Sequence, residues 1–142
     1  MPASTRFAVA VHVLVMLAHY RDRPLTSERL AESANTNPAV IRRLLGSLAD
    51  AGFTRSQLGV GGGTMLARPP EEITLREVYQ AVERSELIAT HRCGTSESCP
   101  VGAHILPVLH GVICRAERAF VEELDRVTLA DITEEVEAAA AS

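Results

Sequence analysis

The sequence predicts a mostly helical fold, with a winged helix-turn-helix unit, a small two-stranded wing and a long C-terminal dimerisation helix. The first observation is composition: 46% of the 142 residues are hydrophobic, only 4% are aromatic and none is Trp, which favours packed helices over a sandwich or barrel. Second, two short helical segments are followed by a glycine-rich hairpin. Third, apolar residues recur every three or four positions from residue 101 to residue 124.

The first two helices have recognisable ends. Thr5 or Ser4 caps a helix that runs to about His19, and this helix is apolar on nearly all sides, which places it at the centre of the core. A short second helix starts after Thr26 and ends near Ala34. Together they predict the first part of a small helical unit.

The third helix lies in "NTNPAVIRRLLGSLADAGF", residues 35–53. Asn37 is a good N-cap, Pro38 suits the first helical position, and Gly52 ends the helix. Two arginines flank an apolar stripe made of Val40, Ile41, Leu44, Leu45 and Leu48. Two short helices joined by a tight turn, the second with exposed arginines, predict a helix-turn-helix.

The segment "FTRSQLGVGGGTMLARPP" predicts the wing. Extended stretches at 53–58 and 64–67 are joined by a glycine-rich tip, and Pro69-Pro70 ends the ladder because proline cannot donate to it. The glycine run lacks a Gly-Lys-Ser/Thr ending and no helix follows it, which argues against a nucleotide-binding loop.

Charge is distributed unevenly along the chain. Residues 1–68 carry eight Arg and four acidic residues, a net +4, and residues 69–142 carry six Arg and fourteen acidic residues, a net −8, which together give −4. A basic first half suits phosphate, and the acidic second half would face away from it. We therefore expect double-stranded DNA as a partner. The candidate contacts are Thr36, Asn37, Ala39, Arg42 and Arg43 around the start of the third helix, with Arg6, Arg55 and Gln57 at the phosphates.

Beyond the wing, "TLRE" is a capping box in which Thr74 and Glu77 open a further helix. A polar loop with two cysteines follows and leads to Pro100 and a long helical stretch. The predicted domains are the winged helix-turn-helix region at 1–70, the connecting helix at 71–86, the cysteine-bearing sensor loop at 87–99, the dimerisation helix and C-terminal helix at 100–134, and a disordered tail at 135–142.

The apolar stripe of the long helix has no obvious place to be buried in so small a domain. We therefore expect it to form a homodimer interface, although it could instead pack only on the chain's own first helix. The stripe consists of Val101, Ile105, Leu109, Val112, Ala116, Phe120 and Leu124.

The segment "THRCGTSESCPVG", residues 90–102, holds Cys93 and Cys99. Cys99 directly precedes Pro100 and so lies near a helix N-terminus, which lowers the pKa of a thiol. An accessible thiol of this kind beside a second one is typical of a redox or electrophile sensor that alternates between dithiol and disulfide. Cys114 falls on the apolar side of the long helix, where we expect a small buried hydrophobe.

Other classes of protein fit the sequence less well. No Cys-x-x-Cys pair, Ser/His/Asp order or carboxylate pair indicates an enzyme, and we expect no resident cofactor or metal ion. The first apolar stretch is too short and too interrupted to span a membrane and has no signal-peptide cleavage site. We therefore expect a cytoplasmic protein with reduced thiols and no membrane association.

Several motifs in fixed order resemble the Rrf-two family of bacterial winged-helix transcriptional regulators. They are "NTNPAVIRRLLGSLADAGF", "GVGGGTMLARPPEEITLREVYQAVE", "CPVG" and "TLADI", and the likeness extends from about Arg6 to Ile132. The "NTNP" and "H...CPVG" patterns look most similar to the YwnA-like branch. The resemblance implies a homodimer that represses from a pseudo-palindromic operator, with the third helix in the major groove and the wing along the minor groove.

The chain departs from the family pattern at the wing and at the cysteines. Leu58 and Thr64 stand where members commonly carry Arg and Tyr, which leaves open a winged protein-interaction module that does not bind DNA. Cluster-binding members carry three evenly spaced cysteines, and the third position here is Ile105. A further alternative is an iron-sulfur cluster on a variant ligand set of Cys93, Cys99 and His12.

Overall fold

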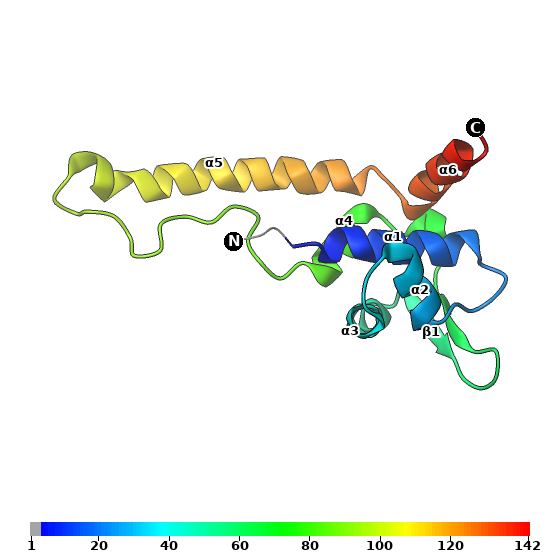
Figure 1. Cartoon of the computed structure of the whole chain (residues 1–142). Coiled ribbons are helices and arrows are strands. Elements are labelled where there is room, and N and C mark those ends of the chain that lie inside the picture. Colours follow the sequence, from blue (N-terminus) through cyan, green and yellow to red (C-terminus); the bar gives the residue numbers. More distant parts are fainter. Residues whose placement is uncertain (1–3) are drawn as a thin grey trace.

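The structure, a computed structural model, describes residues 4–142 and has the mostly helical winged-helix fold that the sequence predicts (Figure 1). The long helix projects away from the remaining helices as a rod, and the loop before it runs alongside (Figure 1). The elements in chain order are α1 (Arg6–His19), α2 (Ser27–Ala34), α3 (Pro38–Asp50), β1 (Thr54–Gln57), β2 (Gly63–Leu66), the 3-10 turn η1 (Pro70–Glu72), α4 (Leu75–Val82), α5 (Pro100–Asp125) and α6 (Leu129–Ala140).

Helix α1 forms the centre of the core, as its all-round apolar sequence predicts. Val13 and Leu14 are completely buried and Leu17 is almost so, since α2, α3, α4 and α6 all pack against this helix. Burying each such side chain stabilises the fold by about 1.5–3 kcal/mol. Residues of the other helices, together with Phe53 just before β1 and Ile73 between η1 and α4, complete the core: Leu30, Ile41, Leu48, Phe53, Ile73, Val78, Val82 and Leu129.

The helix-turn-helix is held by local hydrogen bonds at its predicted ends. Thr26 Oγ1 accepts from the Arg29 backbone N–H at 3.2 Å at the start of α2, and Asn35 ends that helix in the left-handed conformation, with φ 52°. Asn37 Oδ1 then accepts from the Ala39 N–H at 2.7 Å and starts α3. These caps confirm the predicted boundaries and fix the angle between the two helices.

The wing is a two-stranded antiparallel hairpin in which Thr54 pairs with Leu66 and Gln57 with Gly63. Leu25 joins its edge, because the Leu25 N–H donates to Thr64 O at 3.0 Å and the Thr64 N–H donates to Leu25 O at 2.8 Å. A side chain at Gly63 would place its first carbon 2.5 Å from that Leu25 oxygen. Glycine at this position therefore lets the wing lie against the segment that leads into α2.

Helix α4 starts with the predicted capping box, since Thr74 and Glu77 satisfy each other's backbone amides. It ends at Val82, four residues before the predicted end of the connecting helix at residue 86. Helix α5 then runs for 26 residues and continues through Pro107 without a break (Figure 1).

Helix α6 corrects the prediction of a disordered tail over 135–142, because it extends to Ala140. A second capping box, formed by Thr128 and Asp131, starts the helix. The Leu129 N–H donates to Ile73 O at 2.8 Å, and α6 packs along α1. The extra turns contact α1, where His19 Nδ1 lies 3.0 Å from Glu137 Oε1, and alanine, the best helix former, fills their end.

None of the helices formed by residues 4–142 is both long and apolar enough to span a bilayer.

Candidate nucleic-acid interface and thiol site

Helix α3 and the wing project from the same side of the winged-helix unit, opposite to α5 and α6 (Figure 1). Within these elements, Ala39, Arg42 and Arg43 of α3 are exposed, as are Arg55 and Gln57 of β1. Alternate residues of a strand share a face, so Arg55 and Gln57 point the same way. The structure therefore places five of the eight predicted DNA-contacting residues on exposed positions of α3 and the wing.

Two of the predicted arginines already have partners within the chain. Arg42 pairs with Glu28 of α2 at 3.1 Å. The backbone amide at the start of α2 is the largest cause of the lowered pKa of the Glu28 carboxyl, and the Arg42 guanidinium lowers this pKa further. Arg6 donates from Nε to Val82 O at 3.0 Å and lies 3.5 Å from Glu83 Oε1. Arg6 therefore ties α1 to α4, and the role in phosphate binding predicted for it must compete with this ion pair.

The two remaining predicted contacts lie in the turn before α3. Asn37 is exposed, but its Oδ1 is occupied by the cap of α3, so only its amide nitrogen is free to donate. Thr36 is half-buried, and its N–H donates to Ala31 O at 3.0 Å. The sequence predicts the capping role of Asn37, and a cap and a DNA contact favour the same polar residue types.

The predicted dimer stripe divides between two faces of α5. Leu109, Phe120 and Leu124 are half-buried and share one face of α5, where Phe120 contacts Tyr79 of the same chain, while half-buried Ile105 shares the face of Val101 and Val108. Another face stays open, and its apolar members are Val101, 67% exposed, Val108, 66% exposed, Val112, 48% exposed, and Ala116. Val108 was missed by the sequence analysis, although its seven-residue spacing from Val101 is the heptad signal that could have found it.

Three aromatic rings join the winged-helix unit to α5. Phe7 of α1 packs edge-on against Tyr79 of α4 with ring centroids 5.6 Å apart. Tyr79 in turn packs edge-on against Phe120 of α5 with centroids 5.2 Å apart. Burial raises the pKa of the Tyr79 hydroxyl, with smaller contributions from Glu83 and Glu117. These rings form the joint at which the long helix leaves the rest of the molecule.

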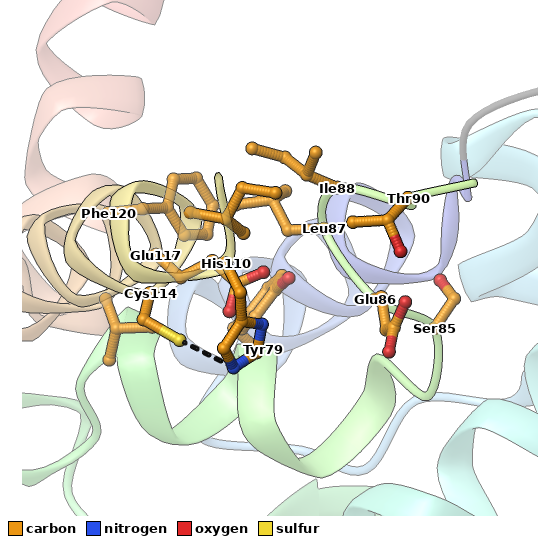
Figure 2. Close-up of a pocket in the computed structure, with 12 residues that line it drawn as sticks. Tyr79, Ser85, Glu86, Leu87, Ile88, Thr90, His110, Cys114, Glu117 and Phe120 are labelled. Carbon is orange, nitrogen blue, oxygen red and sulfur yellow. Dashed lines mark hydrogen bonds between the residues drawn. The ribbon is translucent and has the colours of Figure 1, made fainter. Parts of the chain in front are cut away.

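A cavity of about 310 Å³ lies beside this joint, between α4, the start of the loop and α5 (Figure 2). Cys114 lies on its wall and is exposed, which corrects the prediction of a buried hydrophobe. The Cys114 Sγ is 3.4 Å from His110 Nε2, one helical turn earlier (Figure 2). The buried position at this level of α5 is taken by the neighbouring Ile113, which is 8% exposed.

The predicted thiol site lies at the far end of α5, away from the winged-helix unit (Figure 1). Cys93 and Cys99 are both exposed and unbonded. Cys99 is the N-cap residue of α5, and the Gly102 and Val101 backbone N–H groups lower the pKa of its thiol. The predicted position of Cys99 at the start of a helix is therefore confirmed.

The residues of one chain do not complete a site for an iron-sulfur cluster. Such clusters need about four ligands. Within residues 4–142, no three His, Cys, Asp or Glu side chains come together as metal ligands would. His12 is in α1, where its Nε2 lies 2.8 Å from Ser33 Oγ, while Cys93 and Cys99 lie at the opposite end of the molecule (Figure 1). The variant ligand set is thus not assembled within a single chain.

Comparisons with known proteins agree with the fold and the motifs. The profile of the Rrf2 family, described as an iron-dependent transcriptional regulator, matches residues 3–135. YwnA of Bacillus subtilis strain 168, named as an HTH-type transcriptional regulator, is 38% identical over 130 residues, which cover 91% of this chain and 95% of YwnA.

Solved structures show the same architecture. The crystal structure of a transcriptional regulator from Lactobacillus plantarum has a TM-score of 0.80 at 28% identity and covers 94% of this chain and 90% of its own. The oxidized form of Staphylococcus aureus CymR has a TM-score of 0.71 at 25% identity and covers 94% and 97%. The family and the homologues are transcriptional regulators, not enzymes. The chain belongs to the Rrf2 family of transcriptional regulators.

Proposed function

We propose that this regulator binds a pseudo-palindromic DNA operator as a homodimer, represses transcription from it, and loses affinity when Cys93 and Cys99 are oxidised. The observation that carries the proposal is the arrangement of the elements. The α3 and wing surface faces one way, while the thiols lie at the free end of the helix that projects from the opposite side (Figure 1).

Three features support DNA as the partner. Arg43 and Arg55 are exposed and, within residues 4–142, have no ion-pair partner, so both are free to meet phosphates or base edges. The first 68 residues carry the net positive charge, and these form α1 to α3 and the wing. The third feature is that the chain belongs to a family of transcriptional regulators. Arginine bidentate to guanine would give specificity, and the remaining arginines would supply salt-dependent affinity.

The open apolar face of α5 supports the homodimer. Val101, Val108 and Val112 are between 48% and 67% exposed along a helix that stands away from its own domain. Contiguous exposed apolar surface of this kind marks an association site in a water-soluble fold. Pairing α5 with the same helix of a second copy would bury these side chains and hold two α3 helices at a fixed separation, as a pseudo-palindrome requires.

The thiol chemistry proposed at the loop is a two-step oxidation by a hydroperoxide. The Cys99 thiolate attacks the distal peroxide oxygen, the O–O bond breaks, and the released oxygen takes a proton to give water or an alcohol. The Cys93 thiol then attacks the sulfur of the Cys99 sulfenic acid, the S–O bond breaks, and the hydroxyl leaves as water with the proton of the thiol, which gives the disulfide. The lowered pKa of Cys99 suits it to the first step, and the exposed Cys93 six residues away suits the second.

The family description names iron, so a cluster is the second candidate for the sensor. Exposed Cys93 and Cys99 supply two thiol donors, and further donors would have to come from a second copy of the chain. An anaerobic absorption spectrum with iron and sulfide assays distinguishes the two. A colourless, iron-free dimer would favour the thiol switch. Stoichiometric iron in the purified protein would favour the iron-sulfur cluster as the sensor.

DNA footprinting on the fragment upstream of the gene tests the proposal. Arg42→Ala plus Arg43→Ala is expected to abolish the protected region while circular dichroism and the melting temperature stay close to those of the parent. Arg118→Ala on exposed α5 is the matched control and should leave protection unchanged. Full protection by the double variant would show that the recognition surface lies elsewhere. Absence of protection by the parent, reduced and oxidised, would favour the protein-interaction module.

A further inference from the structure

A second basic site lies beside α3, in a pocket of about 250 Å³ between the start of α1, the side of α3 and the end of α4. The start of α1 and the end of α4 lie beside α3, at the point from which the loop leaves for α5 (Figure 1). Three arginines from three elements line the pocket, Arg6 from α1, Arg43 from α3 and Arg84 from just beyond α4. Arg84 belongs to none of the motifs in the sequence.

The pocket carries net positive charge. None of its lining residues is acidic. The adjacent carboxylate, Glu83, is only 12% exposed, and it is occupied by Arg6 at 3.5 Å and by the Ser4 hydroxyl, which donates at 2.7 Å. Arg43 and Arg84 are exposed, and neither has an ion-pair partner among the described residues. Two guanidinium groups are therefore left to bind an anion.

The donors around the pocket suit a phosphate group. Guanidinium groups bind phosphate oxygens in paired hydrogen bonds, and the Thr5 and Ser47 hydroxyls on the same wall can donate to further oxygens. The N-terminal end of the 14-residue helix α1 lies at the same pocket and adds the partial positive charge of its free amides. Apolar Val9, Leu44 and Val82 form the floor, which strengthens each charge interaction.

We propose that this pocket binds one phosphate of the operator backbone, with Arg84 and Arg43 as its ligands. The inference rests on the proposed function, because it takes α3 to lie in the major groove. Arg43 lies on α3 and also lines the pocket, so the pocket is adjacent to the α3 surface proposed to bind DNA. A phosphate beside the groove occupied by α3 would lie at this edge of the winged-helix unit.

Arg84 also connects DNA binding to the sensor loop. The stretch between Val82 at the end of α4 and Pro100 at the start of α5 carries Arg84 near its origin and both cysteines further on. A phosphate held by Arg84 fixes the origin of that stretch. Because coupling between two sites is reciprocal, a disulfide that changes the path of the loop must change the affinity for the phosphate.

The test is the salt dependence of operator binding by Arg84→Gln, measured by fluorescence anisotropy on the reduced dimer. Losing one phosphate contact should lower the slope of log K against log salt by about one, and weaken binding roughly three- to tenfold to specific and scrambled DNA alike. Arg118→Gln on α5 is the control and should match the parent. An unchanged slope and affinity in Arg84→Gln would overturn the proposal.

Two further measurements separate the possible sources of the anion and the coupling. Inorganic phosphate titrated without DNA, followed by thermal shift, should stabilise the parent more than Arg84→Gln. The same stabilisation together with unchanged DNA binding by Arg84→Gln would assign the pocket to a free anion. The ratio of reduced to oxidised affinity should be smaller in Arg84→Gln than in the parent, and an equal ratio would remove the coupling. If the parent itself fails to bind DNA, the proposed function fails, and this inference with it.

Discussion

The Tyr79 ring of α4 packs edge-on against the Phe120 ring of α5, with centroids 5.2 Å apart. Phe7 of α1 contacts the other side of Tyr79 at 5.6 Å. This aromatic contact spans the joint between the proposed DNA-binding unit and the proposed dimerisation helix. The angle at the joint therefore sets how far apart two copies of α3 would lie in a dimer paired through α5.

Phe120→Ala should weaken both the fold and operator binding. Removing a half-buried ring costs about 1–3 kcal/mol, because the apolar contact and the edge-to-face interaction are both lost. Operator affinity should fall beyond what the loss of folded protein explains, since the orientation of α5 is no longer fixed. Chemical denaturation and anisotropy at the same temperature measure the two effects. Phe120→Tyr, which keeps the ring, is the control, and equal operator affinity in Phe120→Ala would contradict the role of the joint.

Val108→Asp should dissociate the dimer. The side chain is 66% exposed on the open face of α5, so the variant has no reason to misfold, but a buried carboxylate between two helices is strongly unfavourable. Sedimentation equilibrium at micromolar concentration should give the monomer mass. Val60→Asp at the fully exposed wing tip is the matched control and should stay dimeric. A monomeric parent protein at that concentration would contradict the proposed homodimer.

The alkylation rate of Cys99 should reach half its maximum at a pH below the ordinary thiol value of about 8.5. The Gly102 and Val101 amides lower the pKa of Cys99, so the reactive thiolate is already abundant at lower pH, and the rate rises as pH passes through the lowered value. Iodoacetamide kinetics on Cys93→Ser plus Cys114→Ser measure this site alone. A midpoint at or above 8.5 would show that the helix N-terminus does not activate the thiol.

Glu77→Gln should lower stability at neutral pH and lose its effect in acid. The Arg68 guanidinium, 2.8 Å from Glu77, is the largest cause of the lowered pKa of Glu77. A carboxyl with a lowered folded pKa stabilises the fold above its unfolded pKa, and this contribution disappears as pH falls through the folded value. The difference in melting temperature from the parent should therefore shrink below pH ~4.3, the unfolded value.

The expected size of this effect is small. Glu77 is 38% exposed, so solvent screening keeps the ion-pair contribution below about 1 kcal/mol. Glu71→Gln, an exposed residue of the nearby 3-10 turn, is the control and should leave the pH dependence unchanged. If the difference in melting temperature between Glu77→Gln and the parent stayed constant from pH 3 to pH 7, the charge of the carboxyl would not be the source of the stabilisation.

Much of the fold could be predicted because its boundaries are local. Caps at Thr26, Asn37 and Thr74 and the glycine-rich hairpin place most elements within one or two residues of their observed ends. The faces of α5 could not be predicted in this way. A periodic stripe shows only that a helix has an apolar side, and whether Phe120 meets its own Tyr79 or a second chain depends on tertiary geometry.

The candidate site was predictable in type more than in detail. The position of Cys99 at a helix start follows directly from Pro100, and the structure confirms it. The pairing of Arg42 with Glu28, fourteen residues earlier, depends on the angle between α2 and α3 and has no local sequence signal. Arg84 was missed for the same reason, since only the packing of α1, α3 and α4 brings it to the pocket of Arg43.

The measurement that tests the account most directly is the affinity of the purified protein for its upstream DNA, reduced and after treatment with hydroperoxide. We expect salt-sensitive binding by the reduced protein, roughly tenfold or more weakening on oxidation, and no weakening in Cys93→Ser plus Cys99→Ser. Equal affinities of the reduced and oxidised parent would contradict a thiol switch at this loop.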